Sequence, residues 1–234
     1  MIISINQPGY IPWLGYFDRI ARSDLHIVLD HVQFGKNSFI NRNKVRTPQG
    51  WSWLSVPLKT KGKFEHLAIH SLEIANSSNW RRKHWCALRS SYEKTAFFKK
   101  YSPFLEEVYR KEWTHFNPLL REINCYLLAE LGIKTTIRYS SELEVEGEKE
   151  VLIHSLCQRV KATTYISGPF GRDYINNQAF TESGIRLLFH DYQHPTYAQK
   201  FSTFEPYMSV LDILFNHGQS SLEMIMENQS LKAR

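Results

Sequence analysis

The hydrophobic pattern at the start of the chain predicts a strand, a helix and a second strand in succession. Residues 1–6 form an apolar run that suits a short buried strand, and the segment rich in Pro and Gly after it predicts a loop. Residues 13–21 carry apolar side chains at helical spacing, and residues 25–29 form another apolar run, which ends at Asp30. This order is one βαβ-type unit, and such units normally build a parallel sheet.

A helical middle part separates this unit from a second alternation of strands and helices. Strand-like composition at 51–58 and 66–75 precedes helical patterns over residues 79–131, after which Gly132 is the expected C-cap. Further strands are expected at 135–139, 164–167 and 185–190, and further helices at 149–161 and 209–216. We therefore predict one α/β domain over residues 1–234, Rossmann-like (nucleotidylyltransferase-like), with a mostly parallel sheet and a helical insertion at about 79–131.

The loop after the first strand is the first candidate site. A strand that runs into a Pro/Gly loop and a helix N-terminus places ligands at the carboxyl edge of a sheet, where backbone N–H groups favour an anion. Residues 12–16 resemble, in spacing, the nucleotidylyltransferase signature in which two histidines hold nucleotide phosphates, but Trp13 and Tyr16 take those places here. Ordinary nucleotidyl transfer is therefore not expected. Gln7, Tyr10, Trp13 and Tyr16 become substrate-binding candidates, although the aromatic rings could equally pack the helix against the sheet.

A second group of polar residues follows the second strand. Asp30 ends that strand and faces the same sheet edge as Gln7. The candidates that come after it for substrate binding are Gln33, Lys36, Asn41, Arg42 and Asn43. Arg and Lys bind phosphate or carboxylate, and Asn binds hydroxyl or carbonyl groups. A solvated basic loop is the alternative interpretation.

Two later segments add candidates at strand ends. Ser167 ends a strand and enters a glycine turn, which is a weak phosphate signal because the P-loop Lys-Ser/Thr pattern is missing. His190, Asp191 and His194 have a spacing that could bind a metal, yet Pro195 breaks a regular helix and no third ligand is evident. We predict no metal site, Asp191 as a substrate-binding residue, and His194 as a general base or hydrogen-bond donor.

Composition narrows the function classes only in part. The net charge of +6 suits phosphate ligands, nucleic acid or acidic lipid alike. A basic and aromatic helix at 79–92 could bind nucleic acid or an acidic substrate, or be a solvated face. Three widely spaced cysteines without a CxxC argue against a disulfide framework and fit a reducing cytoplasm. The start lacks a signal-peptide pattern and no apolar run is long enough to span a bilayer, so we predict a cytoplasmic protein without membrane insertion.

Taken together, these blocks resemble the WbqC-like family. The residues that carry the resemblance lie at 7–17, 20–24, 29–34, 41–43, 56–57, 140–143, 165–168, 191–197 and 209–218. The resemblance implies a bacterial protein from surface-polysaccharide or other specialised biosynthetic clusters, with a glycine- or acyl-transfer role toward sugars. It implies no particular cofactor, and neither the cofactor nor the oligomeric state is identified by the sequence.

Our leading hypothesis from the sequence is an acyl or aminoacyl (glycine-type) transferase of surface-polysaccharide or amino-sugar biosynthesis. In it, Lys36 and Arg42 hold the phosphate of a nucleotide-sugar or a carrier arm, and Asp30 or His194 deprotonates the attacking group. No covalent nucleophile is visible, so transfer would be direct. A non-catalytic protein that binds a phosphorylated metabolite or carrier is the alternative. Nucleic-acid binding ranks last, because the aromatic and polar blocks cluster at loop ends rather than along one basic stripe.

Overall fold

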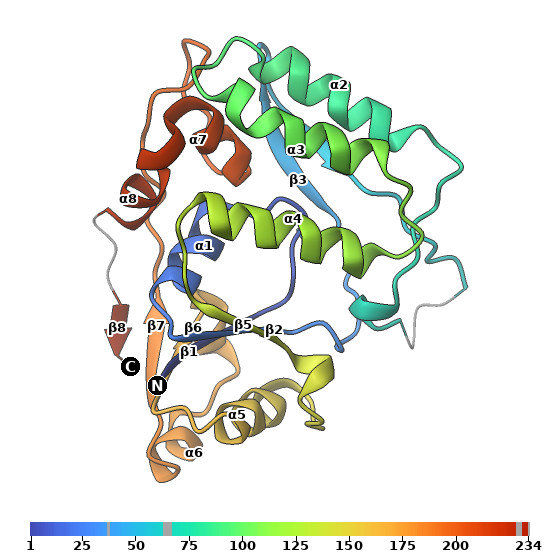
Figure 1. The fold of residues 1–234 in the computed structure, drawn as a ribbon. Coiled ribbons are helices and arrows are strands. Elements are labelled where there is room, and N and C mark those ends of the chain that lie inside the picture. Colours follow the sequence, from blue (N-terminus) through green and yellow to red (C-terminus); the bar gives the residue numbers. More distant parts are fainter. Residues whose placement is uncertain (37, 63–66, 228–230, 234) are drawn as a thin grey trace.

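One sheet of six strands joins the first and last parts of the chain (Figure 1). The computed structural model describes residues 1–36, 38–62, 67–227 and 231–233. In spatial order the strands are β5 (Thr136–Tyr139), β2 (Leu25–Val28), β1 (Ile2–Asn6), β6 (Thr164–Ser167), β7 (Arg186–His190) and β8 (Leu231–Ala233). The first five are parallel, and β8 runs antiparallel to β7. The expected Rossmann-like, mostly parallel sheet is thus confirmed.

The order of the parallel strands fixes where a ligand site can form. Numbered along the chain, they lie as 3-2-1-4-5, so the direction of winding reverses between β1 and β6. These two strands pair directly, with Ile3 opposite Tyr165. Chain connections leave their carboxyl ends in opposite directions, and a crevice opens there. Gln7 directly follows β1 and Gly168 directly follows β6, so both residues border this crevice.

Helices cover both faces of the sheet (Figure 1). One face carries α5 (Lys149–Arg159) and α6 (Asn177–Glu182), and the other carries α1 (Leu14–Ala21), α4 (Phe116–Glu130), α7 (Val210–His217) and α8 (Ser221–Met226). Alternation along β1 explains this, because Ile3 and Ile5 pack in the cluster under α5 while Ser4 points to the other face and bonds His26. Among the residues described, no helix is both long and apolar enough to cross a bilayer.

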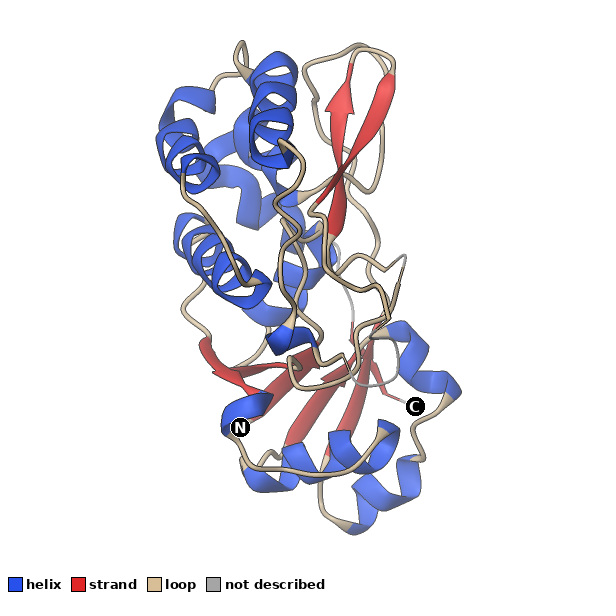
Figure 2. Ribbon diagram, turned by 90° about the vertical axis from the view of Figure 1, so that its right-hand side faces the viewer, coloured by secondary structure: helices blue, strands red, loops and turns tan. Residues whose placement is uncertain are grey.

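A layer beyond α4 completes the molecule. It holds the hairpin of β3 (Arg42–Thr47) and β4 (Gly50–Ser55) together with α2 (Trp80–Tyr92) and α3 (Phe98–Arg110). Figure 2 shows the hairpin extending away from the sheet alongside these helices. The 3-10 helix η1 (Ile69–Ser71) lies instead beside the loop after β2. The strand expected at 66–75 does not form over its described part, residues 67–75. The reason is that its backbone bonds the loop after β2, as in His70 N–H to the Asp30 carbonyl at 2.7 Å, rather than a neighbouring strand.

The loop between β1 and α1 is held from three directions. Tyr10 N–H donates to the Ile40 carbonyl at 2.9 Å, and the amide of Asn124 on α4 donates to the Gly9 carbonyl at 3.1 Å. Asn43 on β3 donates to the carbonyl of Ile11, whose φ of 43° is in the left-handed region that β-branched residues avoid. The surrounding structure therefore imposes this loop conformation and fixes Gln7 and Trp13 at the crevice.

Candidate functional site

A cavity of about 550 Å³ lies at the carboxyl ends of β1 and β6. We call it the cleft. Four segments line it: the loop from Gln7 to Trp13, the inner side of α1, the loop from Ser38 to Asn43, and the turn from Ser167 to Tyr174. Its volume is in the range of small-molecule sites, roughly 300–1,000 Å³. Its place at the reversal point of the sheet is where open α/β sheets bind ligands.

Arg19 is the notable side chain of the cleft. It lies on α1, is only 5% exposed, and is the only charged side chain lining the cleft within the described part of the chain. Its Nε has no hydrogen-bond partner among the described residues, and none of their carboxylates forms an ion pair with it. Burial lowers the pKa of the guanidinium from its usual value, but an arginine stays charged at neutral pH. A cation is thus buried at the ligand-binding edge, and no carboxylate in the described part of the chain is in contact with it.

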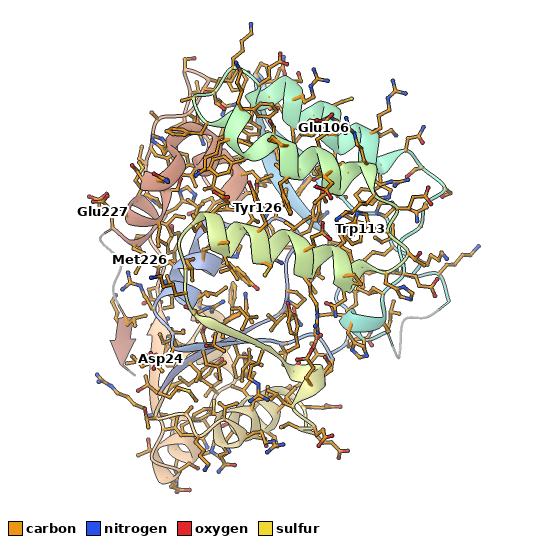
Figure 3. The ribbon with its side chains drawn as sticks, viewed as in Figure 1. Asp24, Glu106, Trp113, Tyr126, Met226 and Glu227 are labelled. Carbon is orange, nitrogen blue, oxygen red and sulfur yellow. The ribbon has the colours of Figure 1, made fainter. Side chains whose placement is uncertain are left out.

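The adjacent carboxylate is occupied by other partners. Asp18 is fully buried and accepts from Nε of Arg22 at 3.0 and 2.9 Å. Its Oδ2 also lies 2.5 Å from Nε2 of His190 at the end of β7. Arg22 additionally donates to the Met226 carbonyl at the end of α8. Figure 3 labels Met226 at that end of the helix. These contacts hold the Asp18 carboxylate on Arg22 and His190, and its charge acts on Arg19 without forming an ion pair with it.

Two glycines let the turn after β6 close over the cleft. A Cβ atom on Gly168 would stand 2.5 Å from Nη1 of Arg19, and one on Gly171 would stand 2.0 Å from Oγ of Ser167. Neither distance is compatible with a side chain unless something moves. Gly168 therefore allows the guanidinium to approach the backbone, and Gly171 allows the 3-10 helix η3 (Pro169–Asp173) to fold over Ser167.

Aromatic rings form the mouth of the cleft. Phe39 is 49% exposed, Phe170 is 79% exposed and Tyr174 is 48% exposed, and all three line the cavity. Phe39 belongs to the loop before β3, whereas Phe170 and Tyr174 belong to the turn after β6. Exposed aromatic residues at the rim of a pocket are typical of ligand-binding surfaces.

Five of the sequence-predicted substrate-binding residues line the cleft, namely Gln7, Trp13, Tyr16, Asn43 and Ser167. Gln7 is exposed at the end of β1, whereas Asn43 and Ser167 are buried and bonded to backbone groups. Trp13 packs edge-on against Tyr192, with 5.5 Å between ring centroids. Burial raises the pKa of Tyr16, so its hydroxyl stays protonated.

Asp30 lies outside the cleft lining and is engaged elsewhere. Its carboxylate is fully buried and accepts from the Ser141 N–H and Oγ at 3.0 Å each, from Ser140 Oγ at 3.2 Å and from the Asn117 amide at 3.3 Å. The two serines belong to the 3-10 helix η2 (Ser140–Glu142), which follows β5. Asp30 therefore ties the end of β2 to the segment after β5.

His194 and Asp191 also have partners away from the cleft. Nδ1–H of His194 donates to the Pro195 carbonyl at 2.8 Å, and Nε2 accepts from the Tyr207 N–H at 3.1 Å. Both ring nitrogens are thereby used in the neutral form, and burial lowers the pKa of the imidazole. Asp191 accepts from Arg172 through both carboxylate oxygens, at 2.5 and 2.9 Å.

The remaining predicted residues lie around the loop and hairpin. Tyr10 is buried, and its hydroxyl bonds Nδ1 of His84 at 2.8 Å and the Tyr109 hydroxyl at 2.5 Å. The Gln33 amide oxygen accepts from the Leu67 N–H at 2.9 Å. Lys36, Asn41 and Arg42 line a separate cavity of about 270 Å³ beside β4, where Arg42 lies 4.5 Å from the Trp53 ring. The structure thus does not bring the proposed phosphate cations Lys36 and Arg42 into the cleft.

Sequence reasoning missed Arg19. The apolar spacing of residues 13–21 predicted a short helix, but it did not show that the structure buries seven of the eight residues of α1, Arg19 among them. One signal was available in the sequence: Asp18 and Arg22 are spaced i, i+4 and pair with each other, which leaves Arg19 over. In the described chain, no three or more His, Cys, Asp or Glu side chains gather in a way that could hold a metal ion.

Comparison with known proteins adds the family. The family model of the WbqC-like protein family matches residues 7–224. The chain belongs to this family. A relative from Mycobacterium tuberculosis (strain ATCC 25618 / H37Rv), the uncharacterized protein Rv1507c, is 38% identical over 218 residues, which cover 92% of this chain and 94% of that protein. No solved structure matches this WbqC-like protein with statistical significance.

Proposed function

We propose that this WbqC-like protein binds a phosphorylated small molecule in the cleft, and that Arg19 contacts the phosphate. The observation that carries the proposal is the buried guanidinium of Arg19, which lacks a contacting carboxylate among the described residues. Burying a charge without a partner is costly, and an anionic ligand offsets that cost. The turn at Gly168 and Gly171 adds backbone close to the same point, which suits the approach of a compact anion.

The rest of the ligand is expected to carry a ring. Phe39 on one rim and Phe170 and Tyr174 on the other offer apolar faces to it. The exposed Gln7 amide offers one donor and one acceptor group next to them. A nucleotide, a nucleotide-sugar or a sugar phosphate has this combination of a ring, polar edges and a phosphate.

Acyl or aminoacyl transfer to an amino sugar, of the kind used in surface-polysaccharide biosynthesis, is the second candidate. The cleft volume favours it, because about 550 Å³ is more than a phosphate alone requires. No His, Asp, Glu, Lys or Cys side chain is part of the described cleft lining, and burial raises the pKa of the lining residues Tyr16, Tyr165 and Tyr174, so these tyrosines stay protonated and do not act as a general base. Transfer would depend on positioning and on the Arg19 charge, which would stabilise negative charge on the reacting oxygen. We therefore place binding ahead of transfer.

A thermal-shift screen of nucleotides, nucleotide-sugars, sugar phosphates and inorganic phosphate tests the proposal. A compound that binds the folded state raises the melting temperature, by an amount that grows with the logarithm of its concentration relative to its Kd. We expect phosphate-bearing compounds with a ring to stabilise the wild-type protein and their dephosphorylated forms not to do so. Equal stabilisation by both forms, or stabilisation that survives in Arg19→Gln, would refute the role given to Arg19.

The transfer candidate needs a separate assay. Amino-sugar nucleotides would be incubated with acyl and glycyl thioesters, and the products measured by mass spectrometry. Formation of an amide or ester that is lost in Arg19→Gln supports transfer in the cleft. Stabilisation by the nucleotide-sugar without any product identifies a binding protein instead.

A further inference from the structure

The hairpin of β3 and β4 has two different faces. Side chains alternate between the two faces along each strand, and Asn43, Val45 and Leu54 are buried together on one of them. This inner face belongs to the core that β3 shares with α2 and α7. The opposite face carries Lys44, which pairs directly with Trp53 in the register of the two strands. We call it the outer face of the hairpin, which extends away from the sheet (Figure 2).

Three aromatic rings follow one another along the outer face. The ring of Phe39, in the loop before β3, lies 5.6 Å from the ring of Trp53, and the ring of Trp53 lies 5.5 Å from that of Trp51, measured between centroids. The first and last rings of this row are exposed, Phe39 by 49% and Trp51 by 42%. Large aromatic side chains that stay exposed beside one another are typical of a surface that contacts another molecule.

Two cations lie against these rings. Nζ of Lys44 is 4.1 Å from the centroid of the Trp51 ring and 5.5 Å from that of Trp53. The guanidinium carbon of Arg42 is 4.5 Å from the Trp53 centroid. Within the described structure, Lys44 forms no ion pair with a carboxylate. The rings therefore hold its ammonium in place and leave the charge available to an anion.

The row of rings and cations has two defined ends. At one end, Arg42 pairs with Ser55, and both residues line the cavity of about 270 Å³ to which Lys36 also contributes. More positive charge thus adjoins the outer face there. At the other end, Arg46 is fully buried and bonded to backbone carbonyl groups, so the exposed part of the face ends at Trp51.

The sequence around the hairpin is strongly basic. Residues 31–64 contain seven Lys or Arg and no Asp or Glu, whereas the net charge of the whole chain is +6. A partner of the outer face is therefore expected to carry several negative charges. The sequence did not reveal one basic and aromatic stripe, because the cations lie on β3 and the tryptophans on β4. Strand pairing brings them together.

Single-stranded nucleic acid combines the two features that this surface matches. Its bases stack on exposed aromatic rings, and its phosphates bind Lys and Arg side chains beside them. A duplex keeps its base faces inside its own stack, and an acidic polysaccharide has negative charges without flat aromatic rings. Neither of them would use the row of three rings.

We propose that the outer face of the hairpin binds single-stranded nucleic acid, with bases stacked on Phe39 and Trp51 and phosphates bound by Lys44 and Arg42. This inference does not rest on the proposed function of the cleft, because Lys44 and Trp51 are not part of the described cleft lining.

Fluorescence anisotropy of the full chain with a labelled oligothymidine of about twelve nucleotides tests the proposal. An abasic strand of the same length, which keeps the phosphates but lacks the bases, is the control. We expect the oligothymidine to bind at least about fivefold more tightly than the abasic strand. Equal affinity for the two strands would overturn the proposal and identify a general polyanion surface, such as one for an acidic polysaccharide. Absence of binding at about 50 mM salt would overturn it as well.

Two substitutions separate the rings from the charges. Trp51→Leu removes a stacking ring and should weaken binding of the oligothymidine about five- to a hundredfold, with far less effect on the abasic strand. Lys44→Gln removes one phosphate contact and should lower the slope of log affinity against log salt concentration by about 0.7. Lys134→Gln, at an exposed position outside the hairpin, is the matched control and should bind as wild type does.

Unchanged affinity in Trp51→Leu contradicts the proposal, and so does a salt slope in Lys44→Gln equal to that in Lys134→Gln. Should a variant fail to fold, the comparison of the two strands on the wild-type protein still decides, because it requires no substitution.

Discussion

The carboxylate of Asp18 binds Arg22 and His190 and leaves the next residue, Arg19, without an acidic partner in the described structure. Both residues lie on the short helix α1 and both are buried. Asp18 therefore belongs to a buried cluster with Arg22 and His190, whereas Arg19 presents its charge to the cleft. We therefore expect substitution of Asp18 to change the stability of the protein and substitution of Arg19 to change ligand binding.

Asp18→Asn is expected to destabilise the protein without removing the cation from the cleft. Breaking a buried ion pair by removing one partner costs about 3–5 kcal/mol, because the remaining charge stays buried. The free energy of unfolding in denaturant measures this loss. Glu106→Gln is the matched control, since it breaks the exposed pair between Glu106 and Arg110 and should cost less than about 1 kcal/mol. A cost at Asp18 as small as that at Glu106 contradicts the structural role of the cluster.

Alanine at the two glycines after β6 should separate stability from ligand binding. Gly171→Ala places a Cβ atom against Ser167 Oγ and is expected to cost about 1–3 kcal/mol through overpacking. Gly168→Ala meets the flexible end of Arg19 instead, so it should displace the guanidinium and weaken phosphate binding at little cost in stability.

Gly35→Ala is the control for both, since a Cβ atom there meets no atom within 4 Å. Unfolding curves and binding titrations on the same three variants provide the comparison. The argument for the close approach of Arg19 to Gly168 fails if Gly168→Ala binds ligand as well as Gly35→Ala does.

Much of this arrangement could be predicted from the sequence, and some of it could not. The strands β1, β2, β6 and β7 come from short apolar runs that end in polar or glycine residues, a pattern that local physics determines. The burial of Arg19 depends on the turn after β6, where Gly168 lies beside its guanidinium, 149 positions later in the chain. The i, i+4 spacing of Asp18 and Arg22 leaves Arg19 over within α1, but it does not indicate that this distant turn will cover the side chain.

The sequence also does not show which groups bind the predicted base residues, Asp30 and His194. Asp30 and His194 stand at positions where a parallel sheet places catalytic groups, which is why their residue types suggested acid–base chemistry. Their hydrogen bonds come from Ser140, Ser141 and Tyr207, none of which the sequence connects to them. A polar residue at a strand end can serve the fold as readily as the ligand, and only the three-dimensional partners distinguish the two roles.

Burial of His26 predicts a loss of stability in acid. Burial, together with the nearby Arg19 charge, lowers the pKa of His26 from 6.5 to about 3 in the folded protein. Because the folded pKa is below the unfolded one, the unfolded chain takes up a proton first as the pH falls. This contribution to stability is therefore complete above about pH 6.5 and is lost progressively toward pH 3, by about 1.4 kcal/mol per pH unit per proton.

Unfolding free energies measured between about pH 7 and pH 4 test this dependence, with wild type and His26→Asn compared at each pH. The substitution removes the titrating group, so the slope in the variant should be shallower by up to one proton. Other groups contribute equally to both proteins and cancel in the difference. An identical slope in the two proteins would show that His26 does not titrate as its buried position requires.

The affinity of the wild-type protein and of Arg19→Met for the best phosphate-bearing compound, measured by calorimetry, tests the central claim most directly. A charge-assisted hydrogen bond contributes about 1.5–3 kcal/mol, so we expect the variant to bind about ten- to a hundredfold more weakly. Its unfolding free energy without ligand should be unchanged or higher, because an uncompensated buried charge has been removed. Arg186→Met, at an exposed position on β7, makes the same exchange outside the cleft and should bind as wild type does. Equal affinities in wild type, Arg19→Met and Arg186→Met would contradict the account.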